Sequence, residues 1–320
     1  MKAIQVHEFG GPEVLKLEEI PTPKPGAGQV LVRIHGVGVN PYDTYMRSGT
    51  YAVKPPLPYT PGSDGAGVVE ALGPGITKVK PGDRVYVAKT VTGAYAQYAI
   101  ALESQVQPLP AKTSFAQGAG VWVPYGTAYH ALVHSALARA SETVLVHGAS
   151  GGVGIAGLQF ARAMGLRVLG TASTQKGLDL ALREGAHQVF NHSKPGYVDE
   201  IMKATGGRGV DIILEMLANV NLANDTKLLA TNGRVIVIGN RGEITINPRE
   251  LMARRASIRA FTLWGITQPE ESEIYAAIFA GLENGTLRPV VGKELPLGEA
   301  ARAHKEILEP GAAGKIVLLP

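Results

Sequence analysis

A segment near the middle of the chain carries three glycines at regular spacing directly after an apolar run. The run Val144–Val146 is followed by Gly148, Gly151 and Gly154, where a helical pattern begins. Glycine lets the backbone approach phosphate oxygens closely, and the first turn of a helix offers unpaired N–H groups and the positive end of its dipole. The segment therefore predicts a dinucleotide site, with a plain strand-to-helix turn as the simpler alternative. The residues expected to contact the diphosphate are Ser150, Gly151, Gly152 and Val153, with the Ser150 hydroxyl as a donor.

The register of this glycine turn needs a choice between two patterns. A literal G-x-G-x-x-G occurs at Gly152, Gly154 and Gly157, but its first glycine stands well past the strand end, inside the expected start of the helix. The spacing G-x-x-G-x-x-G from Gly148 places the turn between the strand and the helix, as a diphosphate site requires. We therefore expect the turn to run from Gly148 to Gly154.

The side chains after the next strand indicate which dinucleotide binds. NAD sites usually place Asp or Glu about 20 residues beyond the glycine turn, where it accepts from the ribose hydroxyls. Here the stretch Thr171–Lys176 holds no acid, and the first one is Asp179. Ser173 can donate to a 2′-phosphate and Lys176 can neutralise it, whereas a carboxylate would repel it. NADPH is therefore the predicted cofactor, although Lys176 fits equally well as a solvated lysine on a helical first turn.

The elements that position this turn alternate between strands and helices. Apolar strand patterns from Thr143 to Phe261 are separated in most cases by helical stretches, which is typical of a doubly wound parallel sheet. Six strands are expected, at residues 143–147, 167–171, 188–191, 210–215, 234–238 and 257–261. The fold class is therefore predicted to be α/β, with a Rossmann sheet.

The first third of the chain has a different texture. Short apolar or alternating runs broken by Gly and Pro indicate a β-rich, barrel-like domain, and no helical periodicity precedes Gly126. After residue 262, a helix at 269–284 and a strand at 315–319 are expected to return to that domain. The 320 residues are thus divided into residues 1–124 completed by 263–320, and a cofactor domain at 125–262.

Composition excludes several classes of function. The net charge is +4, from 31 basic and 27 acidic residues without a dense basic stripe, so nucleic acid is not expected as the main partner. The chain has no cysteine, and so no disulfide, thiolate metal site or cysteine nucleophile. No run approaches the about 18 apolar residues of a membrane span, and the first residues lack an apolar signal core. We expect a cytoplasmic protein that does not enter membranes.

Motifs in both predicted domains resemble a known superfamily. Those of the first domain are similar to the medium-chain dehydrogenase/reductase superfamily: Gly36–Asp43, Pro58–Gly67 and Lys80–Val85. Three further segments narrow the resemblance to zeta-crystallin-type NADPH:quinone oxidoreductases: Thr44–Tyr51, Val146–Gly154 and Glu215–Asn221. The resemblance spans nearly the whole chain, and it implies that the first domain is a GroES-like catalytic domain.

Zinc-dependent members of that superfamily differ from this chain in their metal ligands. They carry a cysteine and a Gly-His-Glu motif in the first domain, where this chain has Gly62, Ser63 and Asp64 and no cysteine. We therefore expect no metal. His130 and His134 share a helical face but lack the glutamate of a zinc protease motif, and they are expected to be ordinary polar positions. The other two histidines considered, His35 and His147, lie in apolar strand patterns and are expected to be buried, satisfied imidazoles without a role.

The resemblance also implies which residues form the site in the cleft between the domains. Asn40, Tyr45 and Tyr51 are expected to be catalytic, with Asn40 orienting a carbonyl and the tyrosines offering flat faces and hydroxyls to an acceptor. The simpler alternative for the two tyrosines is that they are ordinary half-buried loop aromatics. Further cofactor contacts are expected from Tyr51 and Thr127, and from the strand ends at His192, Asn219, Asn221, Ile238, Gly239, Asn240 and Arg241.

The predicted reaction is zinc-independent transfer of reducing equivalents from NADPH to a small-molecule quinone, in one-electron steps to a semiquinone or in one two-electron step. Reduction of α,β-unsaturated carbonyls, such as enals and enones, is the enzymatic alternative. An RNA-binding or structural, crystallin-like role is the non-enzymatic one. By resemblance, the strand at 257–261 pairs across a two-fold axis, which predicts a homodimer or a homotetramer.

Overall fold

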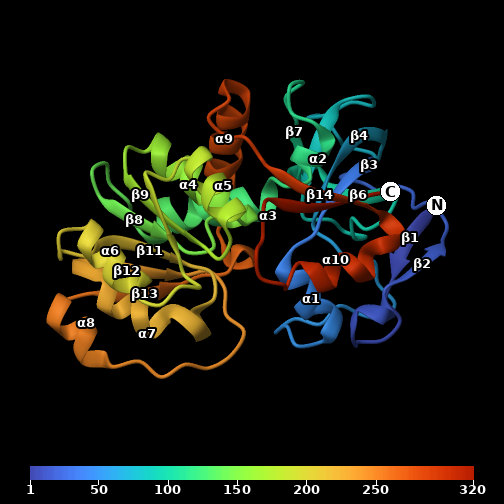
Figure 1. Cartoon of the computed structure of the whole chain (residues 1–320). Coiled ribbons are helices and arrows are strands. Elements are labelled where there is room, and N and C mark those ends of the chain that lie inside the picture. The colour runs from blue at the N-terminus through green and yellow to red at the C-terminus, as the bar shows by residue number, and fades with distance from the viewer.

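The computed structural model describes all 320 residues and shows two lobes side by side (Figure 1). One lobe is built around the strands β8 to β13, and the other contains β1 to β7. The chain begins and ends in the second of these, where the labels N and C lie close together. The helix α9 (Gln268–Asn284) stands near the junction of the lobes.

The first lobe contains a six-stranded parallel sheet, as predicted. Its strand order is β10-β9-β8-β11-β12-β13, and each neighbouring pair runs parallel. This is the 3-2-1-4-5-6 order of a dinucleotide-binding sheet. The strands are β8 (Thr143–Val146), β9 (Arg167–Ala172), β10 (Gln188–Asn191), β11 (Val210–Glu215), β12 (Leu229–Val237) and β13 (Ser257–Ala260). The carboxyl ends of β8 and β11 lie next to each other at the centre, which is the reversal point where such sheets bind ligands.

Helices cover both faces of this sheet because each has an apolar stripe to bury. Separate apolar clusters fill the two sides, one around Leu145 and Ile213 and the other around Val146 and Leu214. The helices are α4 (Gly152–Ala163), α5 (Gln175–Arg183), α6 (Tyr197–Ala204), α7 (Ala218–Leu228) and α8 (Pro248–Arg254). They are joined by α3 (Trp122–Tyr129), which continues as a π-helical turn at His130–Ser135. None of the helices is both long enough and apolar enough to cross a membrane.

The second lobe is a largely antiparallel sheet with the order β14-β15-β3-β4-β5-β7, and β6 also pairs with β3. The central strand β3 alternates buried and exposed side chains before entering a buried stretch at its end. Strand β15 pairs with β3, so the last residues of the chain complete the sheet begun by the first hundred. The strands of this sheet are β3 (Gln29–Gly38), β4 (Asp64–Leu72), β5 (Arg84–Ala88), β6 (Tyr98–Leu102), β7 (Val106–Pro108), β14 (Val291–Pro296) and β15 (Lys315–Leu319). The short helices α2 (Phe115–Gly118) and α10 (Ala300–Glu306) pack beside it. Strands β1 (Lys2–Gln5) and β2 (Lys16–Glu19) pair with each other in a separate antiparallel sheet.

Short helices precede Gly126, although the sequence shows no helix-long periodic run there. Helix α1 (Pro41–Ser48) follows β3 directly, and its first turn is closed by the Asp43 carboxylate, which accepts from the Asn40 N–H at 2.8 Å. It ends at Gly49, whose φ of 73° is the left-handed conformation that glycine adopts readily. Eight residues make only two turns, too few for a helical period to stand out from the sequence.

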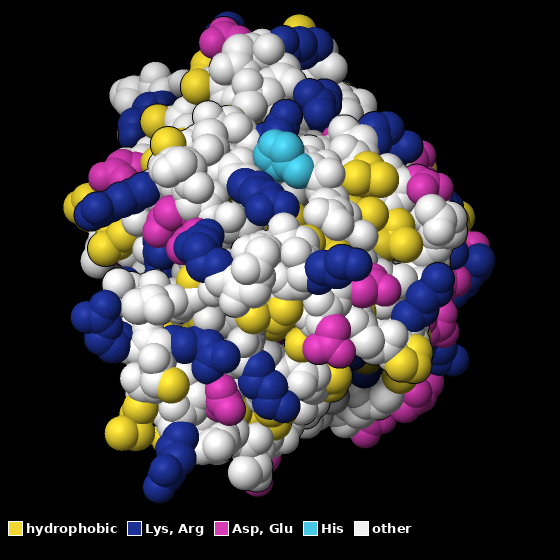
Figure 2. All heavy atoms as spheres, turned by 60° about the vertical axis from the view of Figure 1, so that its left-hand side comes forward, with side chains coloured by type: hydrophobic (Ala, Val, Ile, Leu, Met, Phe, Trp, Pro, Cys, Tyr) yellow, Lys and Arg dark blue, Asp and Glu magenta, His cyan; other side chains and the backbone are white.

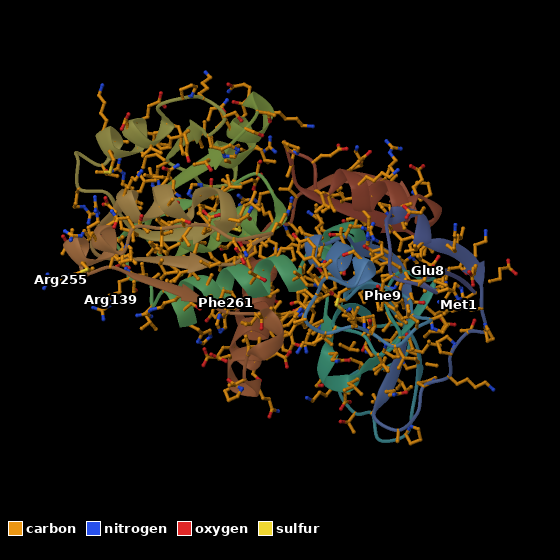
Figure 3. All side chains as sticks on the ribbon, turned by 90° about the horizontal axis from the view of Figure 1, so that it is seen from below. Met1, Glu8, Phe9, Arg139, Arg255 and Phe261 are labelled. Atoms are coloured by element: carbon orange, nitrogen blue, oxygen red, sulfur yellow. The ribbon has the colours of Figure 1, made fainter.

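The largest apolar cluster crosses the seam between the lobes. It joins Tyr86 and Val317 of the antiparallel sheet to Trp122 of α3 and to Val146 of the parallel sheet. Residue 124, the predicted boundary, lies inside α3, and the domain limits stay a prediction. In a view from below, Phe261 lies near the junction while Arg139 and Arg255 lie at the outer end of the cofactor lobe, opposite Met1 (Figure 3).

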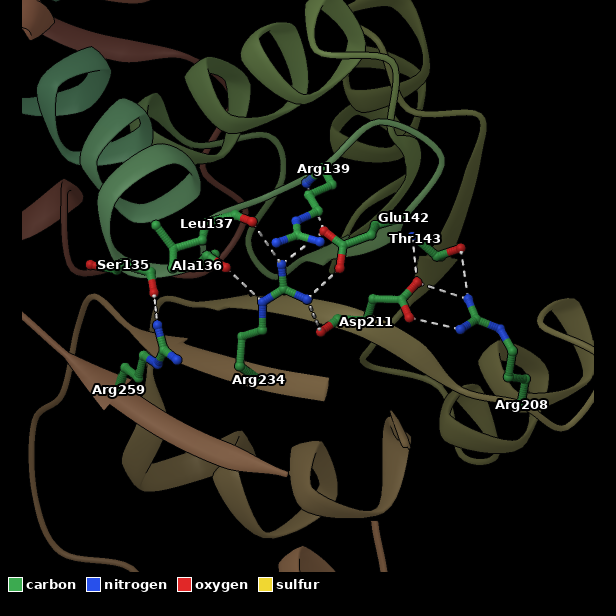
Figure 4. Close-up of polar contacts among 10 residues, drawn as sticks. All are labelled: Ser135, Ala136, Leu137, Arg139, Glu142, Thr143, Arg208, Asp211, Arg234 and Arg259. Atoms are coloured by element: carbon green, nitrogen blue, oxygen red, sulfur yellow. Dashed lines mark hydrogen bonds and ion pairs between the residues drawn. The ribbon is translucent and has the colours of Figure 1, made fainter. Parts of the chain in front are cut away.

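The amino ends of the parallel strands are held by a buried arginine (Figure 4). The Arg234 guanidinium donates to both carboxylate oxygens of Glu142 at 2.6 and 2.8 Å, and to the Ala136 carbonyl at 2.8 Å. Beside it, Arg208 donates to both carboxylate oxygens of Asp211. These ion pairs stabilise the edge of the sheet opposite the glycine turn.

Candidate functional site

The glycine turn has the geometry that the chosen register requires. Gly148 has a φ of 55°, Gly151 precedes the helix, and α4 begins at Gly152. A Cβ on Gly154 would lie 2.3 Å from the Gly148 carbonyl oxygen, so a side chain there would push the turn apart. The literal G-x-G-x-x-G match therefore starts inside the helix. The turn leaves the first N–H groups of α4 at the carboxyl edge of the sheet, where an anion can be bound.

The Ser150 side chain faces the other lobe. Its hydroxyl donates to the Ala312 carbonyl at 2.6 Å, and its own carbonyl accepts from the Gly314 N–H at 2.8 Å. Because the hydroxyl hydrogen is already used, Ser150 ties the glycine turn to the segment before β15. In this conformation the turn offers a diphosphate its backbone N–H groups rather than the serine hydroxyl.

The end of β9 carries no carboxylate that could meet a ribose. Ser173 is half-buried, and the Thr174 hydroxyl caps α5 by accepting from the Gly177 N–H at 3.1 Å. Lys176 is exposed on the first turn of α5 and forms no ion pair. The nearest acid, Asp179, accepts from the Gln175 amide one turn further along the helix. A hydroxyl, a free ammonium and a helix start therefore lie together, as a 2′-phosphate would need.

The predicted residues after β10 and β11 meet at the same edge but have different partners. His192 Nδ1 lies 3.1 Å from the Thr171 hydroxyl. Asn219 accepts from the Arg241 N–H at 2.9 Å, and Asn221 donates to Glu215 at 3.1 Å. The two asparagines therefore brace the loops after β11 and β12 as the structure stands.

The segment after β12 reaches across to the other lobe. The N–H groups of Ile238 and Gly239 donate to the Glu215 carbonyl at 2.8 and 3.2 Å, and the Asn240 amide donates to the Gly242 carbonyl at 2.7 Å. The Arg241 Nε donates to the Tyr45 hydroxyl at 2.9 Å. This contact joins two residues that are 196 positions apart, both predicted from sequence, and it spans the seam between the lobes.

The tyrosines of the second lobe are displayed by the end of α1. The Tyr45 carbonyl accepts from the N–H groups of Thr50 and Tyr51 at 3.0 and 3.2 Å, which folds the turn back against the helix. Burial raises the pKa of Tyr51, so its hydroxyl stays protonated at neutral pH.

Tyr51 belongs to an aromatic group that includes a residue the sequence did not single out. Its ring centroid lies 6.1 Å from that of Tyr42, which in turn lies 5.3 Å from that of Trp264. Trp264 comes from the short 3-10 turn Leu263–Gly265 after β13. The chain has only two tryptophans, so Trp264 stood out in the composition. No motif spacing, however, connected it to the site.

Asn40 is turned into the interior of the second lobe. It is 2% exposed, its amide nitrogen donates to Asp64 at 3.0 Å, and its amide oxygen accepts from the Lys315 ammonium. Lys315 also pairs with Asp64 at 3.3 Å, and Asp64 accepts from the Val123 N–H at the start of α3. Both ends of the amide are thus occupied by buried partners, which suits a supporting role more than contact with an acceptor.

Sequence reasoning missed Lys315, whose buried ammonium lies beside Asn40 and Asp64. Burial lowers the pKa of Lys315 and raises that of Asp64, while their mutual attraction opposes both shifts. The available signal was a lysine that opens the apolar strand β15.

Thr127 and the histidines complete the predicted positions. Thr127 lies on α3, is 7% exposed and makes no side-chain hydrogen bond. His147 is buried, as expected. The expectation for His35 is wrong, because β3 turns this side chain outward, where it stacks on Phe115. His130 and His134 lie 3.5 and 3.3 Å from the carboxylates of Glu270 and Glu273 on α9, respectively.

Two hollows of the surface lie away from this sheet edge. One cavity of about 480 Å³ is lined by the ends of α4 and α5, and another of about 580 Å³ by residues 78–85 and 103–111. On the face that the cofactor lobe presents in Figure 2, basic side chains are dispersed among acidic and uncharged ones. The candidate site is defined by the residues that converge on the sheet edge.

Comparison with known proteins agrees with this geometry. Residues 26–111 match the family described as alcohol dehydrogenase GroES-like domain, and residues 152–280 match the family described as zinc-binding dehydrogenase. The human quinone oxidoreductase is 54% identical over 321 residues, covering 100% of this chain and 98% of the human protein.

Two solved structures extend the comparison. The Escherichia coli quinone oxidoreductase complexed with NADPH has a TM-score of 0.90 at 30% identity, covering 100% of both chains. A 2-haloacrylate reductase has a TM-score of 0.82 at 31% identity, covering 100% of this chain and 99% of the other.

Proposed function

The chain belongs to the quinone oxidoreductase family of the medium-chain dehydrogenase/reductase superfamily, and from this premise we propose that it catalyses the reduction of quinones by NADPH. The observation that carries the proposal is the 54% identity to the human quinone oxidoreductase over the whole chain. The alignment covers the whole chain, and so both lobes and the seam where the candidate residues meet.

The residues present fit NADPH. A side chain at Gly154 would collide with the turn, which explains why the diphosphate cradle is built of glycine. The end of β9 offers Ser173 and Lys176 with no competing carboxylate, so a 2′-phosphate gains partners there and meets no repulsion. Bound in this way, NADPH would supply the reducing equivalents from its nicotinamide.

The chain's own groups would hold and orient the acceptor. The Arg241–Tyr45 contact spans the seam, where the nicotinamide end would be held, and a planar acceptor could lie against the faces of Tyr51, Tyr42 and Trp264. The Tyr51 hydroxyl remains protonated and can donate a hydrogen bond to an acceptor oxygen. The chain has no cysteine for a thiolate zinc site, so we propose a zinc-independent reaction that depends on orientation and exclusion of water.

The test is steady-state oxidation of NADPH with 1,2-naphthoquinone and, separately, with a 2-alkenal. We expect turnover with the quinone and little with the alkenal.

The second candidate function is reduction of α,β-unsaturated carbonyls, which the similarity to a 2-haloacrylate reductase favours. Turnover of the alkenal alone would establish that function and exclude the first. Repeating the quinone assay after dialysis against a chelator should leave the rate unchanged.

The quaternary structure is proposed on the same basis. Strand β13 forms an edge of the parallel sheet, and its Arg259 and Ala260 side chains are exposed. Pairing of this edge with its copy across a two-fold axis would give a homodimer or one half of a homotetramer. Sedimentation equilibrium of the full chain measures the stoichiometry.

A further inference from the structure

A row of buried polar side chains lies directly under the carboxyl edge of the parallel sheet, and the proposed function uses none of them. It contains His147 at the end of β8, Thr171 in β9 and Asp225 in α7, which are 2%, 0% and 0% exposed. His147 and Thr171 belong to the neighbouring strands that carry the glycine turn and the 2′-phosphate residues. Buried polar groups need hydrogen-bond partners, and the order of donors and acceptors among these side chains gives the hydrogen bonds a direction.

The distances form one continuous chain. His147 Nε2 lies 2.8 Å from Asp225 Oδ1, and His147 Nδ1 lies 3.2 Å from the Thr171 hydroxyl. The same hydroxyl lies 3.1 Å from His192 Nδ1. The other ring nitrogen of His192, Nε2, has no partner within the chain and is not a buried unpartnered atom, so it reaches the surface.

This cluster is a hydrogen-bonded relay and not a metal centre. Ligand atoms of His147, Glu215 and Asp225 lie within 4.8 Å of one another. However, the 2.8 Å between His147 Nε2 and Asp225 Oδ1 is a hydrogen-bond distance, and an ion bound at about 2.0–2.1 Å to each would hold these atoms further apart.

The donors and acceptors of the relay can be arranged in two orders, which we call its two polarities. Which one forms depends on whether His147 Nδ1 carries a proton. If Nδ1 carries a proton, it donates to the Thr171 oxygen, Thr171 donates to His192 Nδ1, and the His192 proton resides on Nε2. If Nδ1 is bare, Thr171 donates to it instead, and His192 must donate from Nδ1. The outward nitrogen of His192 is then an acceptor.

The groups around His147 favour the first polarity. Burial alone would lower the pKa of His147, but the carboxylates of Asp225 and Glu215 outweigh it and raise that pKa. Burial raises the pKa of Glu215 to about 7, and the remaining groups that face the cluster, His192 from the end of β10 and Tyr197 from α6, stay uncharged at neutral pH. His147 thus lies beside two acidic side chains that favour its protonated form, with Asp225 Oδ1 at 2.8 Å and Glu215 Oε2 at 3.6 Å from Nε2.

We propose that His147 and Thr171 are positioning residues, which hold His192 in the tautomer that presents an Nε2–H donor to the adenosine end of bound NADPH. The inference rests on the proposed function, because it assigns a partner to that donor. Phosphate and ribose oxygens at that end can accept from Nε2–H, whereas a bare nitrogen offers them no donor. The buried Asp225 carboxylate thus determines, through His147 and Thr171, whether the outward nitrogen of His192 is a donor or an acceptor.

Thr171→Val tests the relay without changing the shape of the buried site. It removes the hydroxyl that links the two imidazoles, and Thr171→Ser restores it. The matched control is Thr143→Val, at the other end of the neighbouring strand β8, where the hydroxyl makes a single bond of 3.4 Å to Arg208. NADPH binding is titrated by cofactor fluorescence, and the melting temperature of each variant is recorded.

We expect Thr171→Val to weaken NADPH binding by about five- to tenfold, the usual effect of one lost hydrogen bond to an oriented donor. Thr171→Ser and Thr143→Val should bind as the wild type does. As the pH is raised and His147 loses its proton, the wild type should lose affinity, because the relay then reverses. Thr171→Val should lack this step. Equal affinities and equal pH profiles for wild type and Thr171→Val would overturn the inference.

A measurement on the wild type decides the matter even if Thr171→Val does not fold. Long-range ¹H–¹⁵N spectra report which ring nitrogen of each of the eight histidines is protonated, and His192→Gln assigns the signal. The inference requires a protonated Nε2 and a bare Nδ1 in His192 at neutral pH, and the opposite tautomer refutes it. A wild type that binds no NADPH would refute the proposed function, whereas normal binding with the wrong tautomer refutes only the relay.

Discussion

The buried pair of Lys315 and Asp64 gives the sharpest prediction about stability. Removing the ammonium with Lys315→Met leaves a carboxylate that is 1% exposed without its cation. At the observed 3.3 Å and an effective dielectric constant of about 20, the attraction between the two charges is about 5 kcal/mol. Loss of one partner of such a pair typically costs about 3–5 kcal/mol. Lys315→Met should therefore destabilise the protein by about that amount.

The double variant separates the charge from the packing. Asp64→Asn keeps an oxygen for the Val123 N–H but removes the negative charge, so adding it to Lys315→Met should recover at least about 2 kcal/mol. Urea unfolding followed by circular dichroism, with Lys2→Met on β1 as an exposed control, measures the midpoints. If the double variant is as unstable as the sum of the two single variants, the charges do not interact as the structure indicates.

Three further predictions concern other parts of the molecule. Ser173→Asp with Lys176→Ala should raise KM for NADPH about 10- to 100-fold more than KM for NADH, since it removes two phosphate partners and adds a repelling charge; equal effects on both would exclude this placement. His304 is buried, and burial together with Arg47 lowers its pKa to about 3, against 6.5 when unfolded. Stability should therefore fall as the pH drops below 6.5, by roughly 3 kcal/mol at pH 4.5. His304→Gln should flatten that part of the pH–stability curve, and an unchanged curve contradicts this prediction. Arg234→Met should cost about 3 kcal/mol in thermal unfolding experiments yet leave KM for NADPH unchanged, because Arg234 holds the opposite edge of the sheet; a raised KM would show that the two edges are coupled.

The sequence by itself determined the architecture of the cofactor lobe. The six strands of the parallel sheet appear where apolar runs alternate with helical patterns, because buried parallel strands must be apolar along their length. The glycine register was also readable, since the distance from the strand end distinguishes Gly148 from Gly152 as the start of the turn. Likewise, the absence of an acid between Thr171 and Lys176 could be predicted from the sequence, because it depends only on the residue types at one strand end.

Only the tertiary structure decided which side chains are free to act. Asn40 and Ser150 were chosen for their polar groups, yet the fold occupies them with Lys315 and Ala312, which come from a segment more than 160 residues away. His147 was expected to have no role, and its place in a relay depends on Asp225 from a different element. Such contacts are invisible in the sequence because hydrogen bonds depend on distances between segments that no spacing rule connects. Residue types set what each group can do, and packing decides which partner it meets.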